Sequence, residues 1–126
     1  MMNIQKQIDY WRNSSESDLE TAEILISNKK YIQGLFFCHL CIEKILKASI
    51  VKESGQIPPR SHDLFFLSSQ ALIKFEQNDQ EHIQILMKYQ LEGRYPEYNP
   101  VTPSKENVIS YLNKTKVLME WVKEML

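Results

Sequence analysis

Apolar residues in this chain recur every three or four positions, the spacing that places side chains on one face of an α-helix. They do not alternate with polar residues as they would in a half-buried strand. The pattern predicts helices over residues 3–28, 31–53, 62–76 and 103–126, and a further helix that begins after Asp79. The positions expected to face the core include Ile8, Trp11, Ala22, Leu35, Cys38, Ile42, Leu46, Leu64, Leu67, Leu72, Phe75, Ile83, Leu86, Val108, Leu118 and Val122.

Residues with known preferences for helix ends mark the expected boundaries. Asn28 and Gly55 suit the ends of the first two helices, and the prolines of "SGQIPPRSH" require a non-helical linker after them. The expected starts of the later helices are Ser61 as an N-cap, Asn78 with Glu81 as a capping box, and Thr102 with Pro103 as N-cap and first helical residue. We therefore expect one domain, residues 1–126, that forms an all-α, up-and-down antiparallel bundle of four main helices plus one shorter helix.

Composition and charge narrow the class of function. The chain has 126 residues, 43% of them hydrophobic, and a formal charge of −1, which argues against a strongly basic nucleic-acid surface and leaves RNA a weakly supported partner. No apolar run is long enough to cross a membrane, and the N-terminus lacks the apolar core of a signal peptide, so a cytoplasmic location is expected. Cys38 and Cys41 lie within a predicted helix without a second ligand pair, so we expect two buried, reduced residues and no metal or cofactor.

The chain lacks the familiar motifs of phosphate loops, serine hydrolases and zinc proteases, so its three histidines are the first candidates for chemistry. His82 lies among polar residues in a first helical turn and is expected to be solvated. His39 precedes Glu43 by four residues on one helix and is expected to be a hydrogen-bonded structural histidine. His62 begins a helix near Arg60, where it could bind an anion or cap the helix.

The segment "LEGRYPEYNP", residues 91–100, interrupts the helical pattern with aromatic, charged and helix-breaking residues. Arg94 is followed by Tyr95 and Pro96, so a stiff backbone could present its guanidinium to a phosphate or carboxylate. Tyr89, Tyr95 and Tyr98 could supply aromatic faces for a nucleobase. The alternative is that Arg94 neutralises carbonyls at a helix end while the tyrosines pack over the end of the bundle. The residues alone leave both interpretations open.

Several segments together resemble the HEPN family, named for a nucleotide-binding domain of higher eukaryotes and prokaryotes. They are "FFCHLCIEKILKASIV", "PPRSHDL" and "YQLEGRYPEYN", in this order over nearly the whole chain. The resemblance implies a helical bundle that is commonly a homodimer. It also implies a nucleotide-binding module, often encoded beside a minimal nucleotidyltransferase in a toxin–antitoxin-like pair.

Many HEPN proteins are metal-independent ribonucleases whose signature is an arginine and a histidine separated by four to six intervening residues. At that spacing after Arg94 the chain has Asn99, Pro100 and Val101, and asparagine cannot take a proton from a ribose hydroxyl near neutral pH. The resemblance is therefore to the non-catalytic branch, with no predicted catalytic residue. A divergent ribonuclease that uses Arg94 is the alternative. The predicted ligand-binding residues are Arg94, Tyr95, Tyr98, Tyr89, His62, Lys47 and Glu43.

Overall fold

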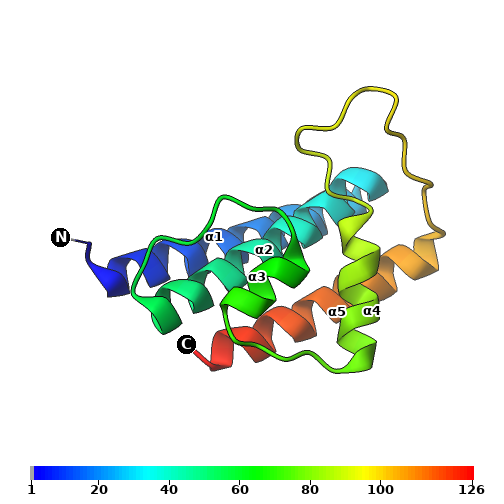
Figure 1. Ribbon diagram of the computed structural model, residues 1–126. Coiled ribbons are helices and arrows are strands. Elements are labelled where there is room, and N and C mark those ends of the chain that lie inside the picture. Colours follow the sequence, from blue (N-terminus) through cyan, green and yellow to red (C-terminus); the bar gives the residue numbers. More distant parts are fainter. Residues whose placement is uncertain (1) are drawn as a thin grey trace.

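The computed structural model describes residues 2–126 and contains five helices. These are α1 (Ile4–Ser27), α2 (Tyr31–Ser54), α3 (Leu64–Gln70), α4 (Gln77–Met87) and α5 (Lys105–Glu124). The predicted all-α bundle is confirmed, and no strand occurs among the described residues. Figure 1 shows α1, α2 and α5 side by side as long rods, with the shorter α3 and α4 laid against them.

The first two helices form an antiparallel hairpin whose ends follow from local chemistry. Asn3 begins α1, because its side chain accepts a hydrogen bond from the backbone N–H of Lys6. Only residues 28–30 separate the two helices, and Lys29 takes the left-handed backbone that this tight connection needs, with φ 63°. Gly55 ends α2 with φ 67°, a conformation that glycine adopts without strain. These boundaries lie within about one residue of the predicted ones.

Helix α2 is the centre of the molecule, because it contacts each of the other four helices. Its fully buried residues include Leu35, Cys38, Ile42, Ile45, Leu46 and Val51. At Gly34 the hairpin is so close that a Cβ atom would lie 2.5 Å from Cγ1 of Ile26 on α1. A helix buried on several faces has no free polar face, and the polar residues it carries must find partners inside the protein. Glu43 and Lys47 are two such buried polar residues of α2.

The third helix is shorter than predicted. Asp63, and not Ser61, is the N-cap of α3, with its carboxylate accepting from the N–H groups of Phe65 and Phe66. The helix ends at Gln70, and Leu72 then adopts φ 58° and leaves its side chain 79% exposed. The prediction that Leu72 faces the core was wrong, because the left-handed backbone there turns the chain out of the helix. Phe75 is buried as expected.

Two predicted helix starts were also wrong. Helix α4 begins at Gln77, so Asn78 lies inside its first turn, and Glu76 is an N-cap without a side-chain hydrogen bond. Helix α5 begins two residues later than predicted, at Lys105, because Ser104 supplies the capping oxygen, which accepts from the N–H of Asn107. Capping residues occurred close together in both segments, and the local pattern alone did not select between them.

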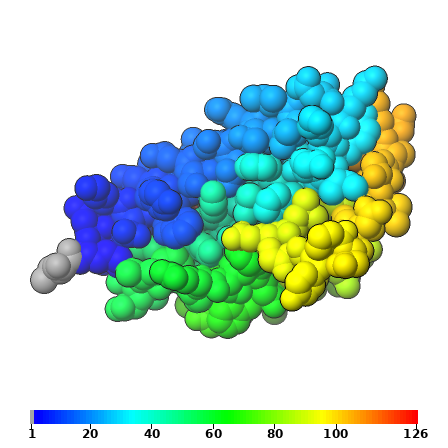
Figure 2. Space-filling model, turned by 90° about the horizontal axis from the view of Figure 1, so that it is seen from above, coloured from blue at the N-terminus to red at the C-terminus, as the bar shows by residue number. Residues whose placement is uncertain are grey.

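The connection from α4 to α5, residues 88–104, is the longest irregular segment and is called the Arg94 loop below. Figure 1 shows it projecting beyond the bundle at the end where α1 meets α2, while both chain termini lie at the opposite end. Figure 2 shows this loop, in yellow, on the surface beside the start of α2. Within residues 2–126 no helix combines the length and the apolar character that crossing a membrane requires.

Candidate functional site

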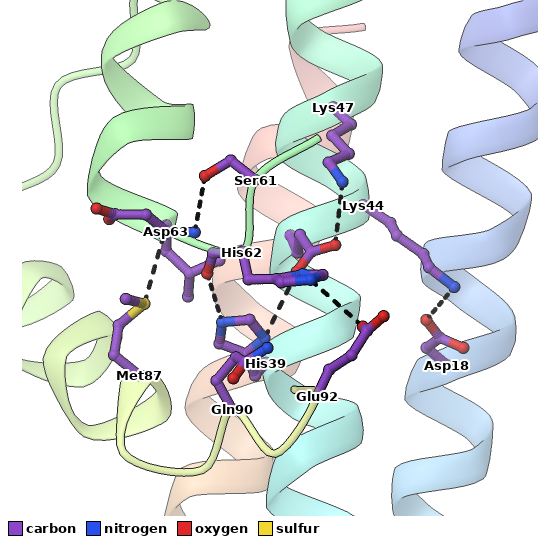
Figure 3. A network of polar contacts seen from close by, with 12 residues as sticks. Asp18, His39, Lys44, Lys47, Ser61, His62, Asp63, Met87, Gln90 and Glu92 are labelled. Atoms are coloured by element: carbon purple, nitrogen blue, oxygen red, sulfur yellow. Dashed lines mark hydrogen bonds and ion pairs between the residues drawn. The ribbon is translucent and has the colours of Figure 1, made fainter. Parts of the chain in front are cut away.

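Glu43 is the centre of a buried polar network on the middle of α2. Its side chain is only 4% exposed, and each carboxylate oxygen has a partner. Lys47, one turn further along the helix, donates from Nζ to Oε2 at 3.1 Å, and Nδ1 of His62 donates to Oε1 at 2.9 Å. Figure 3 shows His62 reaching α2 from the linker that precedes α3. We call these residues, together with His39, the Glu43 network.

The ammonium group of Lys47 is shielded on its other side by α1. Its Nζ lies 5.3 Å from the centre of the Trp11 ring, and its side chain is 8% exposed. A cation between a carboxylate and an aromatic face is stabilised by both, which offsets part of the cost of removing it from water. Glu43 precedes Lys47 by four residues, the favourable order for an ion pair on one helix. Burial makes each partner dependent on the other.

His39 joins the linker to α2 through the main chain. Its Nε2 lies 2.9 Å from the carbonyl oxygen of His62, so this nitrogen carries the proton and donates. Burial lowers the pKa of His39, which keeps the ring neutral, although the nearby Glu43 carboxylate acts in the opposite direction. Its Nδ1 then presents a lone pair 3.8 Å from Glu43 Oε1 and has no hydrogen-bond partner among the described residues. This agrees with the structural role expected for His39.

His62 also connects the Glu43 network to the Arg94 loop. Its Nε2 lies 3.5 Å from Oε2 of Glu92, which is two residues before Arg94. The imidazole is therefore between a buried carboxylate and an exposed one, and its side chain is 42% exposed (Figure 3). The linker and the loop are far apart in the sequence, so this contact brings the two HEPN-like motifs together in space.

The Arg94 loop is held by hydrogen bonds from its own tyrosines. Tyr89 donates from its hydroxyl to the carbonyl of Val101 at 2.9 Å, and the Tyr98 hydroxyl donates to the carbonyl of Lys88. Each bond joins the start of the loop to a residue ten or more positions later. Two predicted ligand-binding tyrosines therefore use their hydroxyl groups to shape the loop. Burial raises the pKa of Tyr89, so its hydroxyl stays protonated and continues to donate.

Arg94 contacts a carbonyl and an aromatic ring of its own loop, as the structural interpretation of the sequence expected. Its Nε donates to the carbonyl oxygen of Gln90 at 3.2 Å, which satisfies an orphan acceptor after the end of α4. Its guanidinium lies over Tyr98, with Cζ 4.3 Å from the ring centre. Neither terminal nitrogen makes a hydrogen bond within residues 2–126. The side chain remains exposed, beside Tyr95, which is 81% exposed.

The structure therefore places the predicted site residues in two neighbouring groups. Glu43, Lys47 and His62 form one network around the buried Glu43 carboxylate. Tyr89, Arg94, Tyr95 and Tyr98 belong to the loop, and Glu92 is the contact between the two groups. Glu92 and the carbonyl of Gln90 were not among the residues predicted from the sequence. No local pattern marks either of them, because their roles depend on the path of the loop.

The prediction for His82 was wrong. His82 is 3% exposed and donates from Nε2 to the hydroxyl of Thr115 on α5 at 2.9 Å; that hydroxyl in turn donates to the carbonyl of Tyr111. Burial, helped by the positive charge of Lys114, lowers the pKa of His82 to about 4. The expectation of a solvated side chain came from polar neighbours in the sequence, but α5 covers this position.

The two cysteines are buried and unpaired with each other. Burial raises the pKa of both thiols to about 12, so neither has the thiolate character of a redox centre. Ser15 on α1 donates to the carbonyl of Cys41, which explains a fully buried serine in the hairpin. Within residues 2–126 no group of three or more histidine, cysteine or acidic side chains has the geometry to hold a metal ion.

Residues 8–125 match the HEPN domain family, so this chain belongs to the HEPN family. No curated protein matches the sequence.

Two solved structures share the fold. One is the crystal structure of TT1696 from Thermus thermophilus, with a TM-score of 0.79 and 20% identity over 95% of this chain and 98% of that chain. The other is the crystal structure of ST0689, an archaeal HEPN homologue, with a TM-score of 0.62 and 19% identity over 99% of this chain and 98% of that chain. At this identity the likeness establishes the arrangement of helices.

Proposed function

We propose that this HEPN protein is a non-catalytic module that binds a nucleotide at the Arg94 loop. The observation that supports the proposal is that the Arg94 side chain is held in place while its terminal nitrogens stay free of hydrogen bonds within residues 2–126. Its Nε donates within the chain and its Cζ lies over the Tyr98 ring, so the side chain is held in one direction with both terminal nitrogens available. A fixed guanidinium is suited to two parallel hydrogen bonds with a phosphate, and exposed Tyr95 offers a face for a base.

The Glu43 network supports this site without touching the ligand. Glu43 orients His62, and His62 meets Glu92 at the beginning of the loop. The buried network thereby links the position of the loop to the rigid central helix. Lys47 and Glu43 are assigned to this supporting role, because their side chains are almost fully buried.

The biological setting of the proposal rests on the family. We infer that the protein acts as a homodimer in the cytoplasm, where its buried cysteines stay reduced, and as the partner of a minimal nucleotidyltransferase in a toxin–antitoxin-like pair. Light scattering tests the first part, since a monomer at micromolar concentration would contradict it. Co-purification with a nucleotidyltransferase encoded in the adjacent reading frame tests the second.

Calorimetric titration with ATP, GTP and AMP tests the nucleotide site directly. Saturable binding is expected for the wild type, with loss in Arg94→Ala and weakening in Arg94→Lys, because lysine keeps the charge but lacks the planar fork. Arg12→Ala is the matched control, since Arg12 pairs with Asp9 on the surface of α1. Equal affinity in the Arg94 and Arg12 variants would place the ligand elsewhere and refute the proposal.

A divergent ribonuclease is the second candidate, because the Glu43–His62 contact is a carboxylate–histidine pair. A neutral His62 whose Nδ1–H donates to Glu43 would offer at Nε2 the lone pair that a general base needs. However, Glu92 lies 3.5 Å from that nitrogen and competes with a substrate hydroxyl for the same position. Cleavage of single-stranded RNA that is abolished by both His62→Asn and Arg94→Ala would establish the ribonuclease and refute the non-catalytic assignment.

A further inference from the structure

A second surface, formed by α4 and α5, is hollowed and has no role in the Arg94 site. Three adjoining hollows of about 500, 260 and 410 Å³ follow these helices. Val117 lines all three, and Trp121 lines two of them. The hollows therefore form one continuous feature, which we call the α4–α5 groove. It lies beside the beginning of α4, whereas the Arg94 loop follows the end of that helix.

The floor of the groove exposes apolar surface that the bundle does not cover. Val117 is 72% exposed and Trp121 is 42% exposed, four residues apart on α5. The Trp121 ring packs against that of Phe75, with centroids 5.9 Å apart. Tryptophan is one of the residues enriched in binding hot spots.

The rim of the groove is acidic. Five carboxylates line it, against the ammonium groups of Lys114 and Lys116, although the whole chain carries a net charge of only −1. Lys116 is also engaged by Glu23 of α1 at 3.2 Å. The lining carboxylates are Glu76, Asp79, Glu81, Glu120 and Glu124.

The carboxylate of Glu76 is close enough to disfavour the charge of Asp79. Neither Glu76 nor Asp79 forms an ion pair within residues 2–126, whereas the acidic residues of α1 that line its contact with α2 and α5 do. Partial burial, with the negative charge of Glu76 as a second cause, raises the pKa of Asp79. A positive group brought to this rim would relieve that repulsion.

The groove also contains a buried polar atom without a partner. His82 lines the largest hollow, and its Nε2 is committed to Thr115. Its Nδ1 accepts no hydrogen bond from any described residue, and a neutral ring leaves that nitrogen as an acceptor. An unsatisfied buried acceptor is uncommon in a folded protein.

From these observations we propose that the α4–α5 groove binds a basic, amphipathic segment of another protein, with an aliphatic anchor over Val117 and Trp121 and lysine or arginine residues against the acidic rim. The groove follows α5 from Asn113 to Glu124, roughly 16 Å at the helical rise, which matches about three turns of a partner helix. A second copy of this chain fits poorly, because a two-fold contact through this face would oppose two acidic rims.

Fluorescence anisotropy tests the proposal. The probe is a dye-labelled helical peptide of leucine and lysine, in which leucine recurs every three or four residues. Saturable binding is expected, with a steep loss at high salt. A leucine–glutamate peptide of the same pattern should not bind, and oligolysine and spermidine should bind much more weakly, since they lack the apolar anchor. Equal binding of the glutamate peptide, of oligolysine or of spermidine would overturn the proposal.

Substitutions locate the binding on the groove. Val117→Ser should weaken the leucine–lysine peptide by about tenfold, whereas Ile57→Ser, which alters another side chain that is 72% exposed, should leave it unchanged. Because Val117 is exposed, circular dichroism should show the same melting temperature for both variants. Identical affinities would overturn the proposal. So would a Val117→Ser protein that changes from dimer to monomer in light scattering, because a second copy would then be the occupant.

Removal of the rim charges gives an independent measurement. The double variant Glu76→Gln with Asp79→Asn should weaken the peptide and reduce its salt dependence, while Glu20→Gln with Glu53→Gln, two exposed carboxylates outside the groove, should do neither. No change in the first double variant would contradict the role of charge. Nucleotide binding at Arg94 should persist in all of these variants, which separates a failure of this proposal from a failure of the nucleotide site.

Discussion

His82 makes a strong prediction about the pH dependence of stability. The ring is neutral in the folded protein because burial lowers its pKa from 6.5 to about 4. The unfolded chain therefore binds a proton from about pH 6.5 downward, and the folded protein does not until about pH 4. Stability from this residue is fully present above the unfolded pKa and is lost as the pH falls towards the folded value.

The size of the effect follows from the two pKa values. Between pH 8 and pH 5 the unfolded state gains most of one proton at His82, which lowers the free energy of unfolding by about 2 kcal/mol. His82→Gln removes the titration while keeping an N–H group that can reach the hydroxyl of Thr115. The variant should lose some stability at pH 8, and its stability should change by about 2 kcal/mol less than the wild type between the two pH values.

Urea denaturation followed by circular dichroism, carried out at both pH values on both proteins, measures this difference. Groups that titrate equally in the two proteins cancel in the comparison, so the remaining term belongs to His82. If wild type and His82→Gln lose the same free energy between pH 8 and pH 5, the neutral buried histidine is refuted and the ring must be accessible to protons in the folded state.

Three further predictions concern the bundle itself. Glu43→Gln leaves the buried Lys47 ammonium without a counter-charge and should lower the free energy of unfolding in urea by about 3 kcal/mol. Glu53→Gln, on the exposed end of the same helix, should lower it by less than about 0.5 kcal/mol. Equal losses would contradict a stabilising buried pair. Gly34→Ala should destabilise the protein by roughly 1 kcal/mol, because the new Cβ would clash with Ile26. In an Ile26→Ala background the same substitution should be neutral or stabilising. An equal loss of stability in both backgrounds would contradict the close contact. Both cysteines should resist an aromatic disulfide reagent in the native protein and react fully in urea, because each thiol has a pKa of about 12; rapid native labelling would show that they are accessible.

Local signals determined much of the fold. The two helices of the hairpin were predicted within about one residue, because their apolar periodicity is long and their ends are marked by Asn28 and by Gly55 in its left-handed conformation. The end of the third helix was not predicted, because the left-handed turn at Leu72 carries no glycine or asparagine to announce it. In a long helix the repeated apolar spacing defines the helix even where one local signal is misleading. A short helix has too few repeats for this.

The sequence by itself established an all-α chain of the HEPN family and named the histidine, glutamate, lysine and arginine that its motifs contain. Only the tertiary structure decided what those residues do. It buried His82 under Thr115, 33 residues away, and it placed His62 between Glu43 and Glu92. The physical reason is that helix formation depends on neighbours within a few residues, whereas burial and charge pairing depend on which distant segments pack together. Arg94 illustrates the difference, since the sequence left its role open and the fold placed it against the Tyr98 ring and the Gln90 carbonyl.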